Sequence, residues 1–90
     1  DQVKVSSLIT PTVYGPESKW EIINIEKYPS SRVYVYNRNG QIVFEKTGYQ
    51  NDWAGTFMGT SDYLPAGSYY YVVEIAQINF IERGWLYINY

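Results

Sequence analysis

Apolar and polar side chains alternate along much of this chain, and a period of two residues predicts β-strands. The alternation is clearest over residues 32–46 and over Gly67–Gln77. Within the first region, Asn39-Gly40 supplies a turn, because a two-residue hairpin needs positive φ at both central positions, which Asn tolerates and Gly adopts freely. We predict a hairpin with strands at Arg32–Arg38 and Gln41–Lys46, and a long strand over Gly67–Gln77.

Weaker patterns predict the remaining elements. The first expected strand is an edge strand that a proline ends, because proline cannot donate a ladder hydrogen bond. Thr47–Asp62 is rich in Gly, Asn, Asp and Thr, so it is expected to be a long connection with one short strand around Ala54–Met58. The other expected strands are Val3–Ile9, Trp20–Ile25 and Gly84–Tyr90.

These elements predict the fold class. No run of ten residues shows apolar positions at helical spacing, and turn signals recur at intervals of roughly ten residues. The expected fold is all-β, a small antiparallel β-sandwich of about seven short strands, with a five-stranded barrel as the alternative. A chain of 90 residues has room for one hydrophobic core, so residues 1–90 are expected to form a single domain.

The aromatic content is high, at 19% of residues including eleven tyrosines. A domain this small cannot bury all of these rings, so some must lie on the surface. Tyr34 and Tyr36 share one strand face, and Tyr69 and Tyr71 share another. Each pair is interpreted either as cross-strand packing or as an exposed platform for a sugar or a protein partner. Three residues are expected in the core: Trp20, Trp53 and Trp85.

Charge and composition exclude several function classes. The net charge is −2 and the seven basic residues are scattered, so nucleic acid is not expected as a partner. No apolar stretch is long enough to span a bilayer, and no membrane insertion is expected. Histidine and cysteine are both absent, which removes the commonest general base, a strong nucleophile and the best zinc ligands. We expect no enzyme activity.

No metal or cofactor is expected either. Calcium requires a dense ring of oxygen ligands, and the loop at Thr12–Ser18 offers too few of them. The carboxylate of Asp52 is instead expected to accept hydrogen bonds from backbone amides two or three residues further along the chain, in an Asx-type turn that fixes Trp53.

Three motifs, in this order and spacing, resemble a known family. They are Tyr36-Asn-Arg-Asn-Gly40, Asn51-Asp-Trp-Ala-Gly55 and Leu64-Pro-Ala-Gly-Ser-Tyr-Tyr-Tyr71. Together they resemble the gliding motility-associated C-terminal domain, also known as the type B sorting domain of the type IX secretion system in Bacteroidetes. The similarity extends from Thr10 to Ile88.

The resemblance implies an immunoglobulin-like sandwich excised from the C-terminus of a larger secreted protein. Such a domain directs an upstream cargo, after passage to the periplasm, through the outer-membrane machinery to the cell surface or the medium. PorP/SprF-like membrane proteins are the implied partners. The motif residues nominated for partner recognition are Tyr36, Asn37, Arg38, Gly40, Asn51, Asp52, Trp53, Gly55, Pro65 and Gly67.

Two further hypotheses stay open at this point. The alternative function is a carbohydrate- or surface-binding module that uses exposed tyrosines. For the export function, the hypothesis is that a receptor recognises the domain by adding a β-strand to an exposed edge of one of its sheets. The first or the last strand of the domain is the expected edge.

Overall fold

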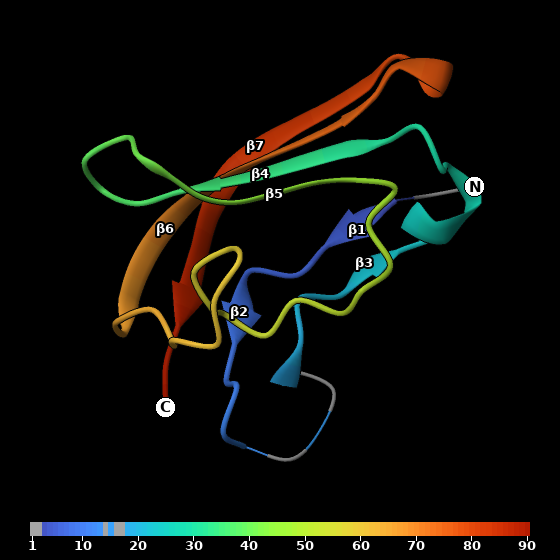
Figure 1. Cartoon of the computed structure of the whole chain (residues 1–90). Helices are drawn as coiled ribbons and strands as arrows, with labels where there is room; N and C mark the ends of the chain where they lie inside the picture. Colours follow the sequence, from blue (N-terminus) through green and yellow to red (C-terminus); the bar gives the residue numbers. More distant parts are fainter. Residues whose placement is uncertain (1–2, 14, 16–17) are drawn as a thin grey trace.

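The structure of the protein is a computed structural model that describes residues 3–13, 15 and 18–90. This part of the chain forms two β-sheets and short 3-10 helices (Figure 1). The strands are β1 (Lys4–Val5), β2 (Leu8–Ile9), β3 (Ile22–Ile23), β4 (Arg32–Tyr36), β5 (Ile42–Thr47), β6 (Gly67–Ile75) and β7 (Phe80–Ile88). The 3-10 helices are η2 (Ile25–Lys27) and η3 (Ala76–Ile78).

The larger sheet has five strands in the order β2-β7-β6-β4-β5, and the smaller sheet pairs β1 with β3. In Figure 1 the small sheet lies below β4 and β5, with the connection after β5 beside it. Buried residues of both layers and of that connection form one core. The predicted all-β sandwich is therefore confirmed. One pair departs from the antiparallel expectation, because β2 runs parallel to β7.

The N-terminal segment is not the single edge strand expected at Val3–Ile9. It divides between the two sheets at consecutive serines: the amide of Ser6 donates to Glu21 O in the small sheet, and Ser7 O accepts from the amide of Tyr87 in the large one. The shift in apolar phase from Val3 and Val5 to Leu8 and Ile9 marks this change of sheet.

The hairpin lies where it was predicted, but its turn differs. The amide of Gly40 donates to Asn37 O at 3.0 Å, and Gly40 has positive φ whereas Asn39 does not, which defines a type I turn followed by a glycine bulge. The Oδ1 atom of Asn37 accepts from the amides of Asn39 (2.9 Å) and Gln41 (3.0 Å). Because this side chain satisfies two loop amides, a three-residue loop replaces the expected two-residue one.

This role of Asn37 gives a first prediction. Asn37→Ala removes the acceptor of two amides and is expected to lower the free energy of unfolding by about 1–2 kcal/mol, as a lost cap does. The Asn39 side chain in the same loop makes no hydrogen bond to the described residues, so Asn39→Ala is expected to change the free energy of unfolding by no more than about 0.5 kcal/mol. Urea unfolding monitored by tryptophan fluorescence measures both, and equal losses would contradict this account of the turn.

The two long strands are β6 and β7, paired along their whole length from Gly67↔Ile88 to Ile75↔Phe80. The last strand begins at Phe80 rather than at the predicted Gly84, because η3 and Asn79 (φ 52°) make a short connection after β6. Gly84 lies on the core side of β7 beneath the ring of Tyr71. A Cβ atom at that position would lie 2.9 Å from the tyrosine Oη, so the glycine makes room for the ring.

Two of the predicted strands, Trp20–Ile25 and the short strand around Ala54–Met58, are shorter in the structure than expected. Of Trp20–Ile25 only Ile22–Ile23 is a strand, since Asn24 takes a left-handed conformation that leads into η2. The strand expected around Ala54–Met58 is reduced to one bridge between Thr56 and Tyr63.

Candidate functional site

Two of the three family-like motifs meet at one end of the large sheet. Strands β4 and β6 are neighbours with Tyr36 opposite Tyr70, so the hairpin loop lies beside the start of β6. Residues 37–39 and 65–69 together line a pocket of about 290 Å³. Of the ten nominated residues, six gather at this end: Tyr36, Asn37, Arg38, Gly40, Pro65 and Gly67.

The third motif is mostly interior. Trp53 is 5% exposed, and Gly55 is buried with φ 83° at a place where a Cβ atom would lie 3.2 Å from the side chain of Pro11. Asn51 has φ 60°, and its Oδ1 atom accepts from the amide of Ile22 at 2.7 Å. Asn51 thus ties the connection to the small sheet, Gly55 lies against Pro11 and Ile88, and Asp52 is exposed.

Tyr49, which the sequence did not single out, connects this segment to the core. Its buried hydroxyl donates to Trp20 O at 2.7 Å and accepts from the amide of Trp53 at 3.0 Å. Burial is the main cause that raises the pKa of Tyr49 well above its usual value. The expected turn at Asp52 is wrong, because no hydrogen bond to the Asp52 carboxylate occurs among the described residues, and the Trp53 amide donates to the Tyr49 hydroxyl instead. Tyr49 follows an alternating strand and precedes a loop motif, and no sequence pattern marks its hydrogen bonds.

The core around Tyr49 is aromatic. The rings of Tyr49, Trp53 and Tyr71 lie 5.5–5.9 Å from the fully buried ring of Trp20, centroid to centroid. Phe44 stacks on Trp53 at 4.6 Å. The predicted burial of Trp20 and Trp53 is confirmed.

Trp85 is not in the core, as was expected, but is 53% exposed on the opposite face of the large sheet. Gly84 occupies the core-side position of β7, so the next side chain must point away from the core. There Trp85 lies opposite Tyr70 on β6, with the two rings edge to face at 5.4 Å. The strand register, rather than hydrophobicity, decides its face.

The tyrosine pairs divide between the two faces. Tyr69 and Tyr71 point into the core, and the Tyr71 hydroxyl donates to Glu82 Oε2 at 2.6 Å. Tyr34 and Tyr36 lie on the outer face, with rings stacked at 6.4 Å and each side chain partly exposed. The two pairs therefore differ in burial: Tyr69 and Tyr71 pack in the core, whereas Tyr34 and Tyr36 are partly exposed.

The outer face carries a shallow groove of about 650 Å³, which we call the aromatic groove. Its lining comes from β4, β6, β7 and the hairpin loop: Tyr34, Tyr36, Asn37, Arg38, Gly40, Tyr70, Val72, Glu74, Ile81, Arg83 and Trp85. Four of the nominated residues, Tyr36, Asn37, Arg38 and Gly40, line this groove, and Asn37 and Arg38 also line the pocket of about 290 Å³. Trp, Tyr and Arg are the side chains that contribute most at protein interfaces.

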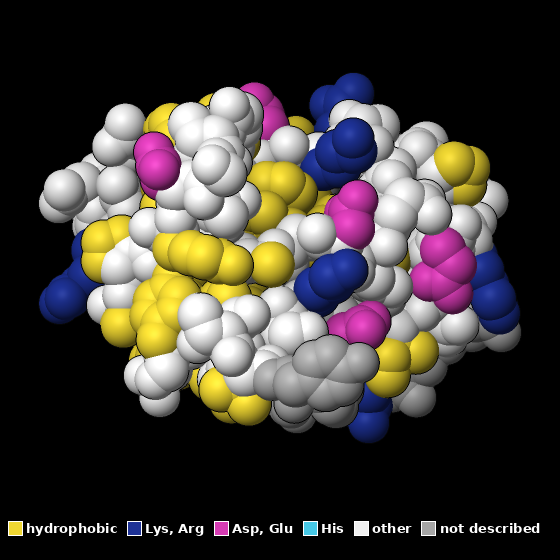
Figure 2. Space-filling view, turned by 60° about the horizontal axis from the view of Figure 1, so that its bottom comes forward, with side chains coloured by type: hydrophobic (Ala, Val, Ile, Leu, Met, Phe, Trp, Pro, Cys, Tyr) yellow, Lys and Arg dark blue, Asp and Glu magenta, His cyan; other side chains and the backbone are white. Residues whose placement is uncertain are grey.

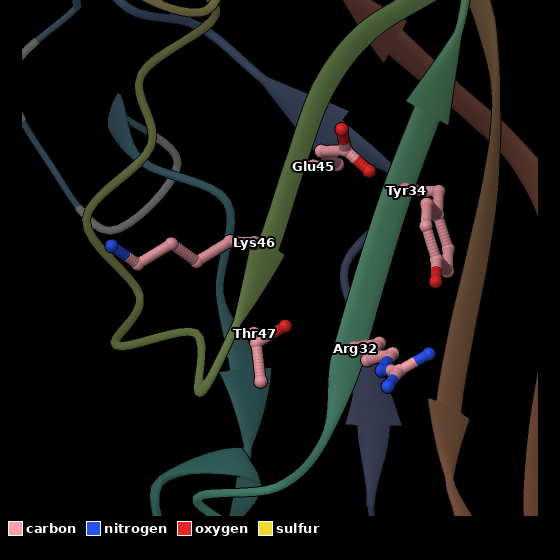
Figure 3. A pocket seen from close by; sticks show the side chains of 5 residues that line it. All are labelled: Arg32, Tyr34, Glu45, Lys46 and Thr47. Carbon is pink, nitrogen blue, oxygen red and sulfur yellow. The ribbon is translucent and has the colours of Figure 1, made fainter.

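A third pocket of about 430 Å³ lies beside β5 on the same face. Figure 3 shows Glu45 projecting toward Tyr34 across the two strands, while Lys46 points to the opposite side of the sheet. The lining side chains are mixed in charge, with Arg32 and Lys46 beside Glu45. In the different view of Figure 2, Lys and Arg are likewise interspersed with Asp and Glu, and hydrophobic side chains gather toward one side.

The described residues contain no cluster of His, Cys, Asp or Glu that could hold a metal ion. Among the helices described, none is long and apolar enough to cross a membrane. The feature that stands out is the aromatic groove, whose lining combines partly exposed aromatic rings with two arginines, Arg38 and Arg83.

Comparison with known families gives one match. The model of the family described as CHU_C type IX secretion signal domain matches residues 3–88. No curated protein and no solved structure matches the chain.

Proposed function

The chain belongs to the type IX secretion signal domains, and from this membership we propose that residues 1–90 are the C-terminal label of a larger polypeptide whose upstream part is the exported cargo. A domain of this family directs its protein to the cell surface or the medium and interacts with the secretion machinery. The family match gives no support to the alternative of a carbohydrate- or surface-binding module.

The proposed partner within the machinery is a PorP/SprF-like outer-membrane protein, and the proposed source is a gliding bacterium of the Bacteroidetes. We propose no catalytic role for the domain. The chain has no histidine or cysteine, so it lacks the commonest general base and a strong nucleophile.

The proposed recognition surface is the aromatic groove with the adjoining hairpin loop. Its anchors are Trp85, Tyr70 and Tyr36, and Arg38 and Arg83 lie at the same groove. One large aromatic side chain buries about 150–250 Å² when a partner covers it, which is a large share of a typical hot spot. The exposure of Trp85 on a sheet face is the observation that carries this assignment, because burying it in the core was otherwise the expected state of so large an apolar ring.

Export of a reporter tests the surface. In a type IX-competent cell, Trp85→Ala in a fusion of residues 1–90 to a periplasmic reporter is expected to reduce the exported fraction by about tenfold or more, as the loss of an interface hot spot does. Tyr87→Ala is the matched control. Tyr87 lies on the same strand and the same face with a similar exposure, but it does not line the groove. We expect export of this control within about twofold of wild type.

Equal export of the wild type and Trp85→Ala would reject the groove as the recognition surface. Equal losses in Trp85→Ala and Tyr87→Ala would show that the effect is not specific to the groove.

A further inference from the structure

β5 is the outermost strand of the large sheet, with β4 as its one neighbour in that sheet. The amide of Gly48, just beyond the strand, donates to Ser31 O at 2.8 Å, and Lys46 pairs with Val33. Backbone groups alternate in direction along a strand, so Gly48 and Lys46 point theirs toward β4. The N–H and C=O groups of Glu45 and Thr47 therefore point away from the sheet.

Nothing in the described part of the chain pairs with these groups. The start of the strand is covered, because Val43 O accepts from the amide of Met58 at 2.9 Å, but no backbone hydrogen bond reaches Glu45 or Thr47 from that side. Glu45, Lys46 and Thr47 are all exposed. The pocket of about 430 Å³ lies along this stretch on the outer face (Figure 3).

The other candidate edges differ. The last strand, β7, was one of the expected edges, and β2 covers it only at Tyr87 and Ile88, so Phe80–Leu86 is a second open edge, which borders the aromatic groove already proposed as the recognition surface. The first strand, β1, belongs to the small sheet, and β2 has two residues. The free side of β3 is occupied, since Asn51 Oδ1 accepts from Ile22 and Trp53 O accepts from the amide of Trp20. Among the described residues, Glu45–Thr47 is thus an uncovered strand edge that lies outside the aromatic groove and has a pocket of its own beside it.

We propose that Glu45–Thr47 of β5 is a strand-addition site, which takes an extended segment of a protein of the secretion machinery. The identity of that partner rests on the proposed function, whereas the site itself rests on the unpaired backbone groups. One N–H and one C=O from each of two residues allow up to four backbone hydrogen bonds. An extended backbone matches them, as in other cases of β-augmentation.

A second copy of this chain is a poor occupant. In antiparallel self-pairing centred on Lys46, two lysines lie directly opposite one another, and centring on Glu45 places two glutamates together, which is unfavourable in both cases. If the pairing is centred on Thr47, half of the partner strand lies opposite Gly48 and the residues after it, which are no longer part of β5. Alternating charges on an edge are a known protection against self-association, so the edge favours a different partner.

The charges also define that partner. In an antiparallel arrangement, a basic residue opposite Glu45 and an acidic residue opposite Lys46 make complementary cross-strand pairs, and a β-branched residue suits Thr47. From its N-terminus to its C-terminus, the pairing segment of the partner then has the sequence Thr-Glu-Lys. The basic side chain enters the pocket on the outer face beside Tyr34.

The first arm of the test uses proline. Glu45→Pro removes an N–H that faces away from β4 and fills its place with the ring, so the ladder of the fold is kept and the added strand is blocked. Glu45→Gln keeps the N–H and is the matched control, and Thr47→Pro is the second variant. In the reporter fusion, both proline variants are expected to lose export by about tenfold or more with unchanged thermal unfolding, while Glu45→Gln is exported within about threefold of wild type.

The second arm uses a defined probe, a cyclic β-hairpin peptide that presents Thr-Glu-Lys on its outer strand. Its binding to the 90-residue domain is expected to slow hydrogen exchange at the amides of Glu45 and Thr47. We expect affinity to fall by about tenfold or more in Glu45→Pro and to fall also when Glu and Lys of the probe are exchanged.

The two arms separate the possible failures. Folded proline variants that are exported like wild type, or a probe that leaves both amides unprotected, overturn the strand-addition site. A wild-type fusion that stays in the periplasm contradicts the proposed function instead, and the peptide arm still decides the edge.

Discussion

Trp20→Ala is expected to lower the free energy of unfolding by about 3–5 kcal/mol, the usual cost of deleting a large buried aromatic side chain. The Trp20 ring is fully buried among three other aromatic rings, and its Nε1 donates to Ser6 O at 2.9 Å. The truncation removes these contacts and leaves a cavity between the two sheets. At about 0.05–0.15 kcal/mol per residue, a domain of 90 residues has a total stability of roughly 5–13 kcal/mol, so this variant loses a large part of it.

Trp85→Ala is the matched control, since it makes the same chemical change on the exposed face. We expect it to lower the stability by about 1 kcal/mol or less, through the lost contact with Tyr70. Guanidinium unfolding followed by far-UV circular dichroism measures both variants. Similar losses in the two would contradict the assignment of Trp20 to the core and Trp85 to the surface.

Tyr49→Phe is expected to cost about 2–4 kcal/mol, although it changes one atom. The Tyr49 hydroxyl satisfies a carbonyl and an amide in the interior, and its removal leaves Trp20 O and the Trp53 N–H without that partner. Tyr34→Phe removes a hydroxyl from a partly exposed ring and should change the stability by less than about 0.5 kcal/mol. An equally small loss for Tyr49→Phe in urea unfolding would show that its two hydrogen bonds contribute little.

The same hydroxyl predicts the response to alkaline pH. Burial raises the pKa of Tyr49 in the folded state, with the nearby Asp52 and Glu21 adding to the rise and the hydrogen bond from the Trp53 backbone opposing it. The folded state therefore holds this proton more tightly than the unfolded state, where tyrosine ionises near pH 10. This contribution is fully present below pH 10, and it is lost at about 1.4 kcal/mol per pH unit as the pH rises above that value. Tyr49→Phe should show a shallower alkaline slope than wild type.

The sequence was sufficient to predict the class of fold and the position of its main elements. Arg32–Thr47 and Gly67–Ile75 alternate regularly, and a regular alternation has one structural interpretation. The turn between β4 and β5 was less certain from sequence, because Asn37 and Asn39 both precede Gly40. Only the structure shows that the Asn37 side chain bonds to the loop amides.

Which side chains of a strand point into the core was harder to predict where both faces of the strand carry apolar residues. In β7 the pattern does not distinguish a core-facing tryptophan from an exposed one, and the pairing with β6 decides. Long-range hydrogen bonds are equally invisible in the sequence, which is why the role of Tyr49 was assigned to Asp52. The serine pair at Ser6-Ser7 shows the same limit, since its two residues bond to different sheets.

The family-like motifs combine two kinds of residue. Asn51, Trp53 and Gly55 serve the fold, whereas Tyr36, Asn37 and Arg38 line the surface that we propose is recognised. Glycine at position 40 belongs to the turn that presents this surface, because its φ of 82° is unfavourable for other residues. The motifs therefore identified the family correctly, although only part of each one is available to a partner.

The most direct test of the export function is the fate of a periplasmic reporter that carries residues 1–90 at its C-terminus. Expressed in a type IX-competent bacterium and in a strain that lacks the machinery, the fusion is expected to reach the surface or the medium only in the competent strain. Antibody labelling of intact cells and of the culture medium measures both. A fusion retained in the periplasm of the competent strain, or released equally by both strains, would contradict the function.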